Sequence, residues 1–169
     1  MNILALDAST KMTGLAIFKD KTFLGKGCIT AASSDLFKRI HKMVDGVDAI
    51  VTEAAIDEIV MEEVIPDHAK NTQTFKALMY LQAAIIIMLH DKHPNVKVEL
   101  IYPGSWRSQA GIKIGRGVKR ETLKDADIKR AKEVFGAQTL NDDEADAMLI
   151  GGVYVGLFGT PVSDELNWD

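Results

Sequence analysis

Residues 2–8, NILALDA, decide the fold: they form an almost unbroken apolar run with a carboxylate, Asp7, at its end. A strand that is covered on both faces reads as a continuous apolar run, so this segment predicts a central strand of a buried sheet. Strands are also predicted at residues 13–19 and 22–30, with a turn over residues 19–21 between them. The first 30 residues therefore predict an antiparallel meander.

Beyond the meander, strands alternate with helices. Ser33 or Ser34 can cap a first helix, whose apolar residues Leu36, Ile40, Met43 and Val44 recur at helical spacing. Further strands are predicted at 58–65 and 96–102, and further helices at 71–91, 120–135 and 141–158. This order predicts an α/β fold with a mixed five-stranded sheet and helices on both faces. A chain of 169 residues suits one domain; we expect it to span residues 1–169, with a disordered acidic tail at 163–169.

Composition limits the class of protein. The chain is 47% hydrophobic and 26% charged, and its one cysteine, Cys28, permits no internal disulfide. We expect Cys28 to be a small buried side chain. The N-terminus lacks a signal-peptide pattern, and the apolar segment 83–89 is too short to span a bilayer. The sequence therefore predicts a cytoplasmic protein with no membrane association.

Charge is distributed unevenly along the chain. The net charge is -4, yet residues 97–132 hold 10 of the 20 basic residues and only 4 of the 24 acidic ones. Such a basic segment can hold a phosphate backbone, while acidic residues elsewhere gather cations. The alternative is an ordinary solvated helix and loop.

Two candidate site residues lie on strands. Asp7 shares a strand face with Ile3 and Ala5, which places it at the rim of the sheet; the alternative is a carboxylate that caps the turn after it. In the strand EIVMEEVI, two adjacent acids, Glu62 and Glu63, cannot both face solvent. One of them should point toward the site, and the alternation alone does not decide which.

Two more candidates open the last helix. Asp143 and Asp146 are three residues apart, so they share a helix face that continues into the core as Ile150 and Val153. Capping and the helix dipole offer an alternative explanation for Asp143, but a weaker one for Asp146.

Buried carboxylates of this kind stay charged when they bind cations. Two-metal phosphodiester hydrolysis needs such a group, and oxygen ligands without cysteine or clustered histidine favour Mg²⁺ or Mn²⁺ over Zn²⁺. His90 and His93 are better explained by the helix dipole than as zinc ligands. The sequence thus predicts a metal-dependent nuclease.

The ordered set ILALDAST, MTGLAIF, IVMEEV and DDEADAM resembles the RuvC family of Holliday-junction resolvases, and most closely its bacteriophage-encoded branch. The resemblance implies a ribonuclease-H-like fold, a homodimer, two Mg²⁺ or Mn²⁺ ions, and paired nicks at four-way junctions that leave 5′-phosphate and 3′-hydroxyl ends. It places the catalytic, metal-binding acids at Asp7, Glu62, Asp143 and Asp146, and so selects Glu62 over Glu63.

The same resemblance extends to the basic segment. IKIGRGVKRETLK is similar to the family's glycine-containing loop and the lysine after it, which assigns a catalytic and DNA-binding role to Lys119. Arg107, Lys113, Arg116 and Arg120 are candidates for phosphate contacts on charge alone. Trp106 could stack on an unpaired base, although a packing role is favoured. The helix over 75–88 is a candidate dimer surface, or else a plain core helix.

One position departs from the family. Some members place an aromatic residue three positions after the acidic strand residue, and here that position is Ile65. We therefore expect weak sequence preference and activity on forks and three-way junctions as well. Three alternatives stay open: an actin-like sugar kinase or ATPase, a ribonuclease-H-like nuclease acting on RNA or RNA/DNA hybrids, and a non-catalytic branched-DNA binding module.

Overall fold

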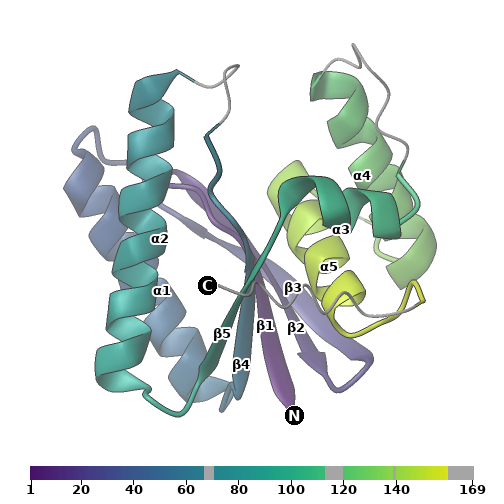
Figure 1. Ribbon diagram of the computed structural model, residues 1–169, viewed down its shortest axis with the longest axis horizontal. Coiled ribbons are helices and arrows are strands. Elements are labelled where there is room, and N and C mark those ends of the chain that lie inside the picture. The colour runs from purple at the N-terminus through teal and green to yellow at the C-terminus, as the bar shows by residue number, and fades with distance from the viewer. Residues whose placement is uncertain (67–70, 113–119, 139, 160–169) are drawn as a thin grey trace, which may run out of the picture.

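A computed structural model describes residues 1–66, 71–112, 120–138 and 140–159 of the chain. These residues form one five-stranded sheet and five helices (Figure 1). The strands are β1 (Asn2–Asp7), β2 (Met12–Lys19), β3 (Thr22–Thr30), β4 (Glu58–Glu62) and β5 (Lys97–Ile101). The helices are α1 (Leu36–Glu53), α2 (Thr72–Lys92), α3 (Pro103–Gln109), α4 (Arg120–Phe135) and α5 (Asp142–Tyr154).

The sheet is mixed, and its strand order is β3-β2-β1-β4-β5. The first three strands form the predicted antiparallel meander, whereas β4 and β5 run parallel to β1. As Figure 1 shows, α1 and α2 cover one face of the sheet while α3, α4 and α5 lie on the other. The predicted fold class is confirmed.

Strand alternation creates two cores around the central strand. Leu4 and Leu6 of β1 point into the layer that contains α1 and α2, while Ile3 and Ala5 point toward α5. All four side chains are buried, as the apolar run predicts. The face that holds Ile3 and Ala5 is the one on which Asp7 continues.

Several local predictions need correction. The N-cap of α1 is Asp35, and not Ser33 or Ser34, because its carboxylate accepts hydrogen bonds from the backbone N–H groups of Phe37 and Lys38. The strand expected to reach residue 65 ends at Glu62, and the last helix ends at residue 154 rather than 158. Cys28 is exposed, and the expectation of a buried thiol is wrong: it lies on β3, the edge strand of the sheet. The tail predicted at 163–169 lies outside the described residues.

Helix α2 has two different faces. Leu81, Ile85 and Leu89 are buried in the core, whereas Tyr80 and Ile87 are 49% and 60% exposed. By length and mean hydropathy of 1.3, α2 is the one helix in the described ranges that could cross a bilayer, and 28% of that apolar window is buried. Its packing on the sheet and on α1 is that of a core helix with an uncovered apolar face.

Candidate active site

The two strand acids meet at one edge of the sheet. Asp7 ends β1 and Glu62 ends β4, and these strands are parallel neighbours in which Leu6 pairs with Met61. Because parallel strands present their carboxyl ends at the same edge, the two side chains emerge together. Both are partly buried, and Glu62 is close enough for its charge to raise the pKa of Asp7.

A glycine on β2 lets the last helix reach this edge. Gly14 pairs with Asp7 across the β1–β2 ladder, and a Cβ atom at Gly14 would lie 2.0 Å from the carbonyl oxygen of Asp143. Only a residue without a side chain permits this approach. The start of α5 therefore rests directly on β2. This contact brings Asp143 close enough to Asp7 for the charge of Asp143 to raise the pKa of Asp7.

The first turn of α5 is fixed by polar contacts. Asn141 accepts a hydrogen bond from the backbone N–H of Glu144 at 2.7 Å, and the Glu144 side chain accepts one from the backbone N–H of Asn141 at 3.2 Å. Lys26 of β3 forms an ion pair with Glu144 at 2.9 Å, and Asp142 pairs with Lys124 of α4. The two hydrogen bonds between Asn141 and Glu144 form a capping box, which fixes the first turn of α5, and the helix geometry then places Asp143 and Asp146.

A single guanidinium group lies among the acids. Arg107 of α3 makes an ion pair with Glu62 (Nη1 to Oε2, 3.6 Å), hydrogen-bonds Asp127 (Nε to Oδ2, 3.1 Å) and hydrogen-bonds Asp146 (Nη2 to Oδ2, 2.9 Å). The Arg107 side chain is only 19% exposed. Burial alone would lower the pKa of Arg107, but the charges of the three carboxylates raise it by more. The net shift of the pKa is upward, so the guanidinium stays charged.

Trp106 anchors Glu62. The indole is fully buried, in agreement with the favoured packing role, and its Nε1–H donates a 2.6 Å hydrogen bond to Oε2 of Glu62. The backbone carbonyl of Glu62 also accepts a bond from Gln82 of α2 at 3.0 Å. Both ends of the glutamate are therefore held by buried partners.

The acid cluster is short of positive charge. Burial, followed by the charges of Glu62 and Asp143, raises the pKa of Asp7 to about 8. Burial, followed by the charge of Asp7, raises the pKa of Asp146 to about 9, although Arg107 opposes that shift. Asp7 and Asp146 thus titrate as a pair that holds fewer than two negative charges at neutral pH. A bound cation would favour full ionisation.

The carboxylate oxygens of this site are the kind of ligand that a hard divalent metal ion prefers. Oδ1 of Asp146 and Oδ1 of Asp127 are buried and accept no hydrogen bond from a nitrogen donor in the described part of the chain, and the two carboxyl groups are close enough to share a hydrogen bond when Asp146 is protonated. When both groups are ionised, these oxygens are costly to bury unless they bind a cation. Among the described residues, no group of three or more histidine, cysteine, aspartate or glutamate side chains is close enough to hold an ion as it stands. Arg107 supplies positive charge between Glu62 and Asp146 in this arrangement.

The structure describes only some of the basic residues that the sequence suggested as DNA contacts. Lys113, Arg116 and Lys119 lie outside the described residues, and Arg120 begins α4 with a side chain that is not described. His90 and His93 end α2 and pair with Asp91 and Asp48, away from the acids of the site. The dipole explanation of the two histidines agrees with this position.

Sequence reasoning missed two features. Asp127 of α4 is 1% exposed and bonded to Arg107, but it sits in a charged helix whose sequence gives no sign of burial. The contact between Trp106 and Glu62 joins residues 44 positions apart, so no local spacing could reveal it.

Several known proteins are similar to this chain. The family model described as "Crossover junction endodeoxyribonuclease RuvC" matches residues 3–119. The chain belongs to the RuvC family. RuvC of Shewanella sediminis is 34% identical over 89 residues, and RuvC of Nitratiruptor sp. is 25% identical over 99 residues. These alignments cover 50% and 56% of this chain and 50% and 61% of the relatives, so the chain spans about half the length of the curated RuvC proteins it matches.

Solved RuvC structures share the fold. "T. thermophilus RuvC in complex with Holliday junction substrate" superposes with a TM-score of 0.71 at 11% identity, covering 94% of each chain. The yeast mitochondrial resolvase Ydc2 gives 0.59 at 12% identity, covering 90% of this chain and 77% of that one. The fold is therefore ribonuclease-H-like, as the resemblance implied. Nucleases of the RuvC family are metal-dependent, which agrees with the donor set.

Proposed function

We propose that this protein is a structure-specific DNA endonuclease that resolves Holliday junctions by paired nicks, leaving 5′-phosphate and 3′-hydroxyl ends. The observation that carries the proposal is the gathering of Asp7, Glu62, Asp143 and Asp146 at one edge of a RuvC-family sheet. Residues from β1, β4 and α5 contribute, and metal-assisted phosphodiester hydrolysis depends on carboxylates that converge on one point. We infer that residues 1–169 form a single nuclease domain.

The four acids would hold two Mg²⁺ or Mn²⁺ ions. When bound, such ions activate water and stabilise the leaving oxygen of a phosphodiester. Trp106 keeps Glu62 in position, and the capped first turn of α5 keeps Asp143 and Asp146 in register. Lys119 is assigned a catalytic role near the phosphate by resemblance to the family.

The basic segment would bind the DNA backbone. Arg107 is the described member of this set that reaches the site, and its ion pairs with Glu62 and Asp146 place its charge where a phosphate would arrive. Lys113, Arg116, Lys119 and Arg120 complete the proposed DNA-contact set. With Ile65 in place of an aromatic residue, we propose that forks and three-way junctions are also cut, with weak sequence preference.

A homodimer would supply two active sites for paired nicks. The uncovered face of α2 supports this proposal, because Met79, Tyr80 and Ile87 are 39%, 49% and 60% exposed. Tyr80 also stacks on Phe37 of α1, which is 68% exposed, with ring centroids 6.2 Å apart. Exposed apolar area of this kind marks an interface. We propose that the dimer works in the cytoplasm of a bacterial host and that the protein is phage-encoded.

A cleavage assay tests the proposal. Purified protein is incubated with a four-way DNA junction, a linear duplex, an RNA/DNA hybrid and a structured RNA, each with Mg²⁺ or with a chelator. We expect Mg²⁺-dependent, symmetric nicks in the junction and little product from the duplex, hybrid and RNA. Asp7→Asn should abolish cleavage, whereas the matched variant Asp125→Asn, at an exposed position on α4, should not.

Each alternative gives a distinct result. Preferential cutting of the hybrid or RNA would replace the proposal with a ribonuclease. Junction binding without cleavage in any divalent metal would point to a binding module. Nicking that survives Asp7→Asn would mean that the site is misplaced.

A further inference from the structure

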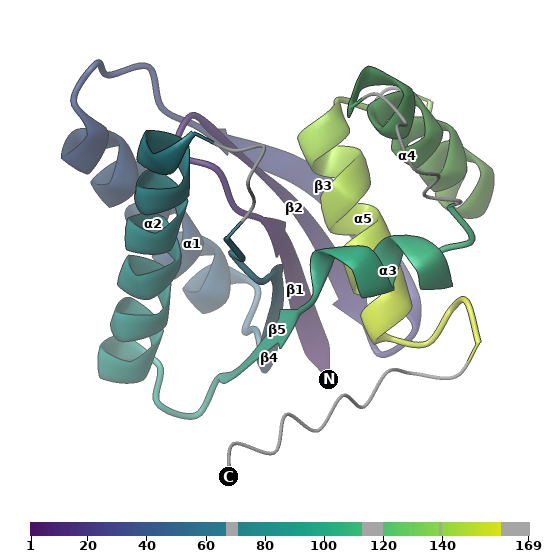
Figure 2. The same cartoon turned by 45° about the horizontal axis from the view of Figure 1, so that its top comes forward.

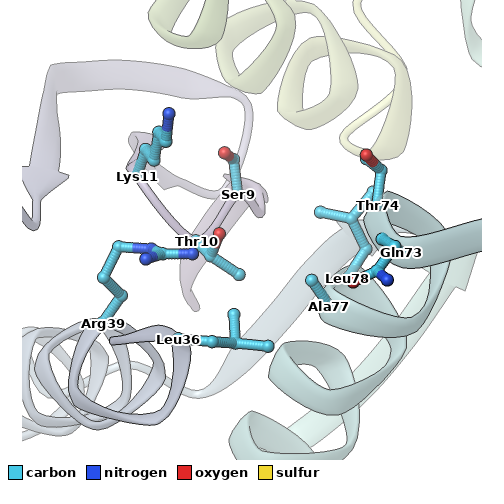
Figure 3. Close-up of a pocket in the computed structure, with 9 residues that line it drawn as sticks. All are labelled: Ser9, Thr10, Lys11, Leu36, Arg39, Gln73, Thr74, Ala77 and Leu78. Carbon is cyan, nitrogen blue, oxygen red and sulfur yellow. The ribbon is translucent and has the colours of Figure 1, made fainter. Parts of the chain in front are cut away.

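A pocket of about 410 Å³ opens between the β1–β2 turn, the start of α1 and the start of α2 (Figure 3). Polar side chains from all three segments line it: Ser9, Thr10, Lys11, Arg39, Gln73 and Thr74. The remaining lining residues are apolar and come from α1 and α2. None of the nine lining residues in the described part of the chain is acidic, and two of them, Lys11 and Arg39, are cationic although the net charge of the chain is -4.

The Arg39 side chain is held in place at the pocket wall. Its Nη1 donates hydrogen bonds to the backbone carbonyls of Ser33 (2.9 Å) and Ser34 (3.0 Å). Its Nε is buried and has no acceptor in the described part of the chain. In Figure 3 the guanidinium extends toward Thr10, across the pocket from Thr74. A fixed, incompletely satisfied guanidinium is suited to an anionic oxygen ligand.

The other walls add hydrogen-bond donors. Lys11 is exposed at the rim and adds an ammonium group, while Thr10 is only 8% exposed. Gln73 and Thr74 lie in the first turn of the 21-residue helix α2, whose N-terminal dipole favours anions. Cationic, hydroxyl and amide donors thus converge from three separate elements.

The pocket adjoins the acid cluster. Ser9 is two residues beyond Asp7, so their Cα atoms are at most about 7 Å apart. The pocket is lined by residues of α1 and α2, on one side of the sheet, and Asp7 lies on the face toward α5, yet both are next to the end of β1. Figure 2 shows these two helix layers on either side of β1. A DNA strand whose phosphate reaches Asp7 could therefore place a neighbouring phosphate here.

We propose that this pocket binds a backbone phosphate of the DNA strand that is cut, one to three nucleotides from the scissile bond, with Lys11 and Arg39 as its cationic ligands. The proposal rests on the proposed nuclease function. The apolar side of the pocket faces the deoxyribose of the same nucleotide. The acids alone cannot fix the strand's direction, so a second phosphate contact would set its register across the site.

Binding measurements in chelator test this assignment without cleavage. The dissociation constant of a fluorescent four-way junction is measured by anisotropy over a range of salt concentrations. Lys11→Ala should weaken binding by about tenfold, as expected for loss of one charge-assisted contact, and reduce the salt slope by about 1. Lys42→Ala, at an exposed position on α1 that does not line the pocket, should change neither value appreciably. Arg39→Lys keeps the positive charge but loses the planar pair of guanidinium N–H donors. Its dissociation constant and salt slope should therefore lie between those of Lys11→Ala and Lys42→Ala.

Neutral methylphosphonates locate the contact. Single substitutions are placed at the three linkages on each side of the cut. One linkage should weaken binding to the wild type by at least about tenfold and weaken binding to Lys11→Ala by clearly less, because that variant has already lost the Lys11 part of the same contact and keeps only Arg39. Inorganic phosphate is also titrated into the protein while the NMR signal of the Thr74 backbone amide is monitored. This titration distinguishes binding of a DNA phosphate from binding of free phosphate.

The outcomes separate this inference from the nuclease proposal. If the wild type binds the junction but Lys11→Ala and Lys42→Ala behave alike, or no linkage has a smaller effect in Lys11→Ala than in the wild type, the pocket assignment is wrong and the nuclease proposal stands. Tight phosphate binding with DNA affinity unchanged by Lys11→Ala would identify a small-anion site and also overturn the assignment. If the wild type does not bind branched DNA, both proposals fail.

Discussion

Replacing Asp7 by asparagine should stabilise the metal-free protein and remove the stabilisation that Mg²⁺ provides. The cause is the pKa of Asp7, which burial and then the charges of Glu62 and Asp143 raise from 3.8 to about 8. Between these values the native protein keeps a proton that the unfolded chain has lost. The free energy of unfolding therefore falls as pH rises through this window, and this loss is complete above pH 8.

The size of the effect follows from the shift. One such group changes the free energy of unfolding by at most about 1.4 kcal/mol per pH unit. Between pH 5.5 and 7.5 this gives a ceiling of roughly 3 kcal/mol. Asp7 retains some exposure to solvent, and its charge interacts with that of Asp146, so we expect about half of that, or ~3–6 °C in Tm. Asparagine resembles the protonated form of Asp7, so Asp7→Asn does not lose this stability as the pH rises.

Thermal unfolding in chelator and in Mg²⁺ measures the difference in stability between the wild type and Asp7→Asn. In chelator, the advantage of Asp7→Asn should grow from pH 5.5 to 7.5. Adding Mg²⁺ should raise the Tm of the wild type, more at pH 7.5 than at 5.5, and should leave Asp7→Asn nearly unchanged. The exposed control Asp125→Asn should follow the wild type. A pH-independent difference, or an equal response of both proteins to Mg²⁺, would refute the reasoning.

Three further substitutions test how the fold builds the site. Gly14→Ala would place a methyl group 2.0 Å from the carbonyl oxygen of Asp143, so we expect a loss of about 1–3 kcal/mol in the free energy of unfolding and strongly reduced cleavage. Trp106→Phe fills the core but removes the 2.6 Å hydrogen bond to Glu62; kcat for junction cleavage should fall while the dissociation constant for DNA changes little. Ile87→Glu charges the exposed face of α2, and light scattering should then detect a monomer.

Each of these has its own check. Gly27→Ala is the control for Gly14→Ala, because a Cβ atom there would make only an ordinary 3.6 Å contact; equal losses in both variants would remove the close-approach argument. If Trp106→Phe retains the wild-type kcat, the indole serves packing alone. A dimer that persists in Ile87→Glu would show that α2 is not the interface.

The parts of this molecule with a short sequence period could be predicted. The apolar run around Leu4 identified the central strand, and strand alternation placed Asp7 on the correct face. Helical spacing put Asp143 and Asp146 on one side of α5. Each of these inferences depends on neighbours within four residues, where backbone geometry alone fixes direction.

The rest depends on contacts between distant segments. Arg107 was expected to contact phosphate, and nothing in its surroundings in the sequence indicates that it bridges Asp127 and Asp146, which are 20 and 39 residues away. The choice of Glu62 over Glu63 needed the family resemblance, because alternation determines only that one of them faces inward. At the start of α1, serine and aspartate cap equally well, so the selection of Asp35 was a matter of tertiary geometry.

The central claim is that acids from β1, β4 and α5 hold divalent ions together. Crystals soaked in Mn²⁺ and measured at the manganese absorption edge test it directly, since anomalous scattering locates each ion independently of phosphate or water. We predict two manganese peaks, with carboxylate oxygens of Asp7, Glu62, Asp143 and Asp146 within bonding distance. Absence of manganese from this edge of the sheet, or peaks only at other carboxylates, would contradict the account.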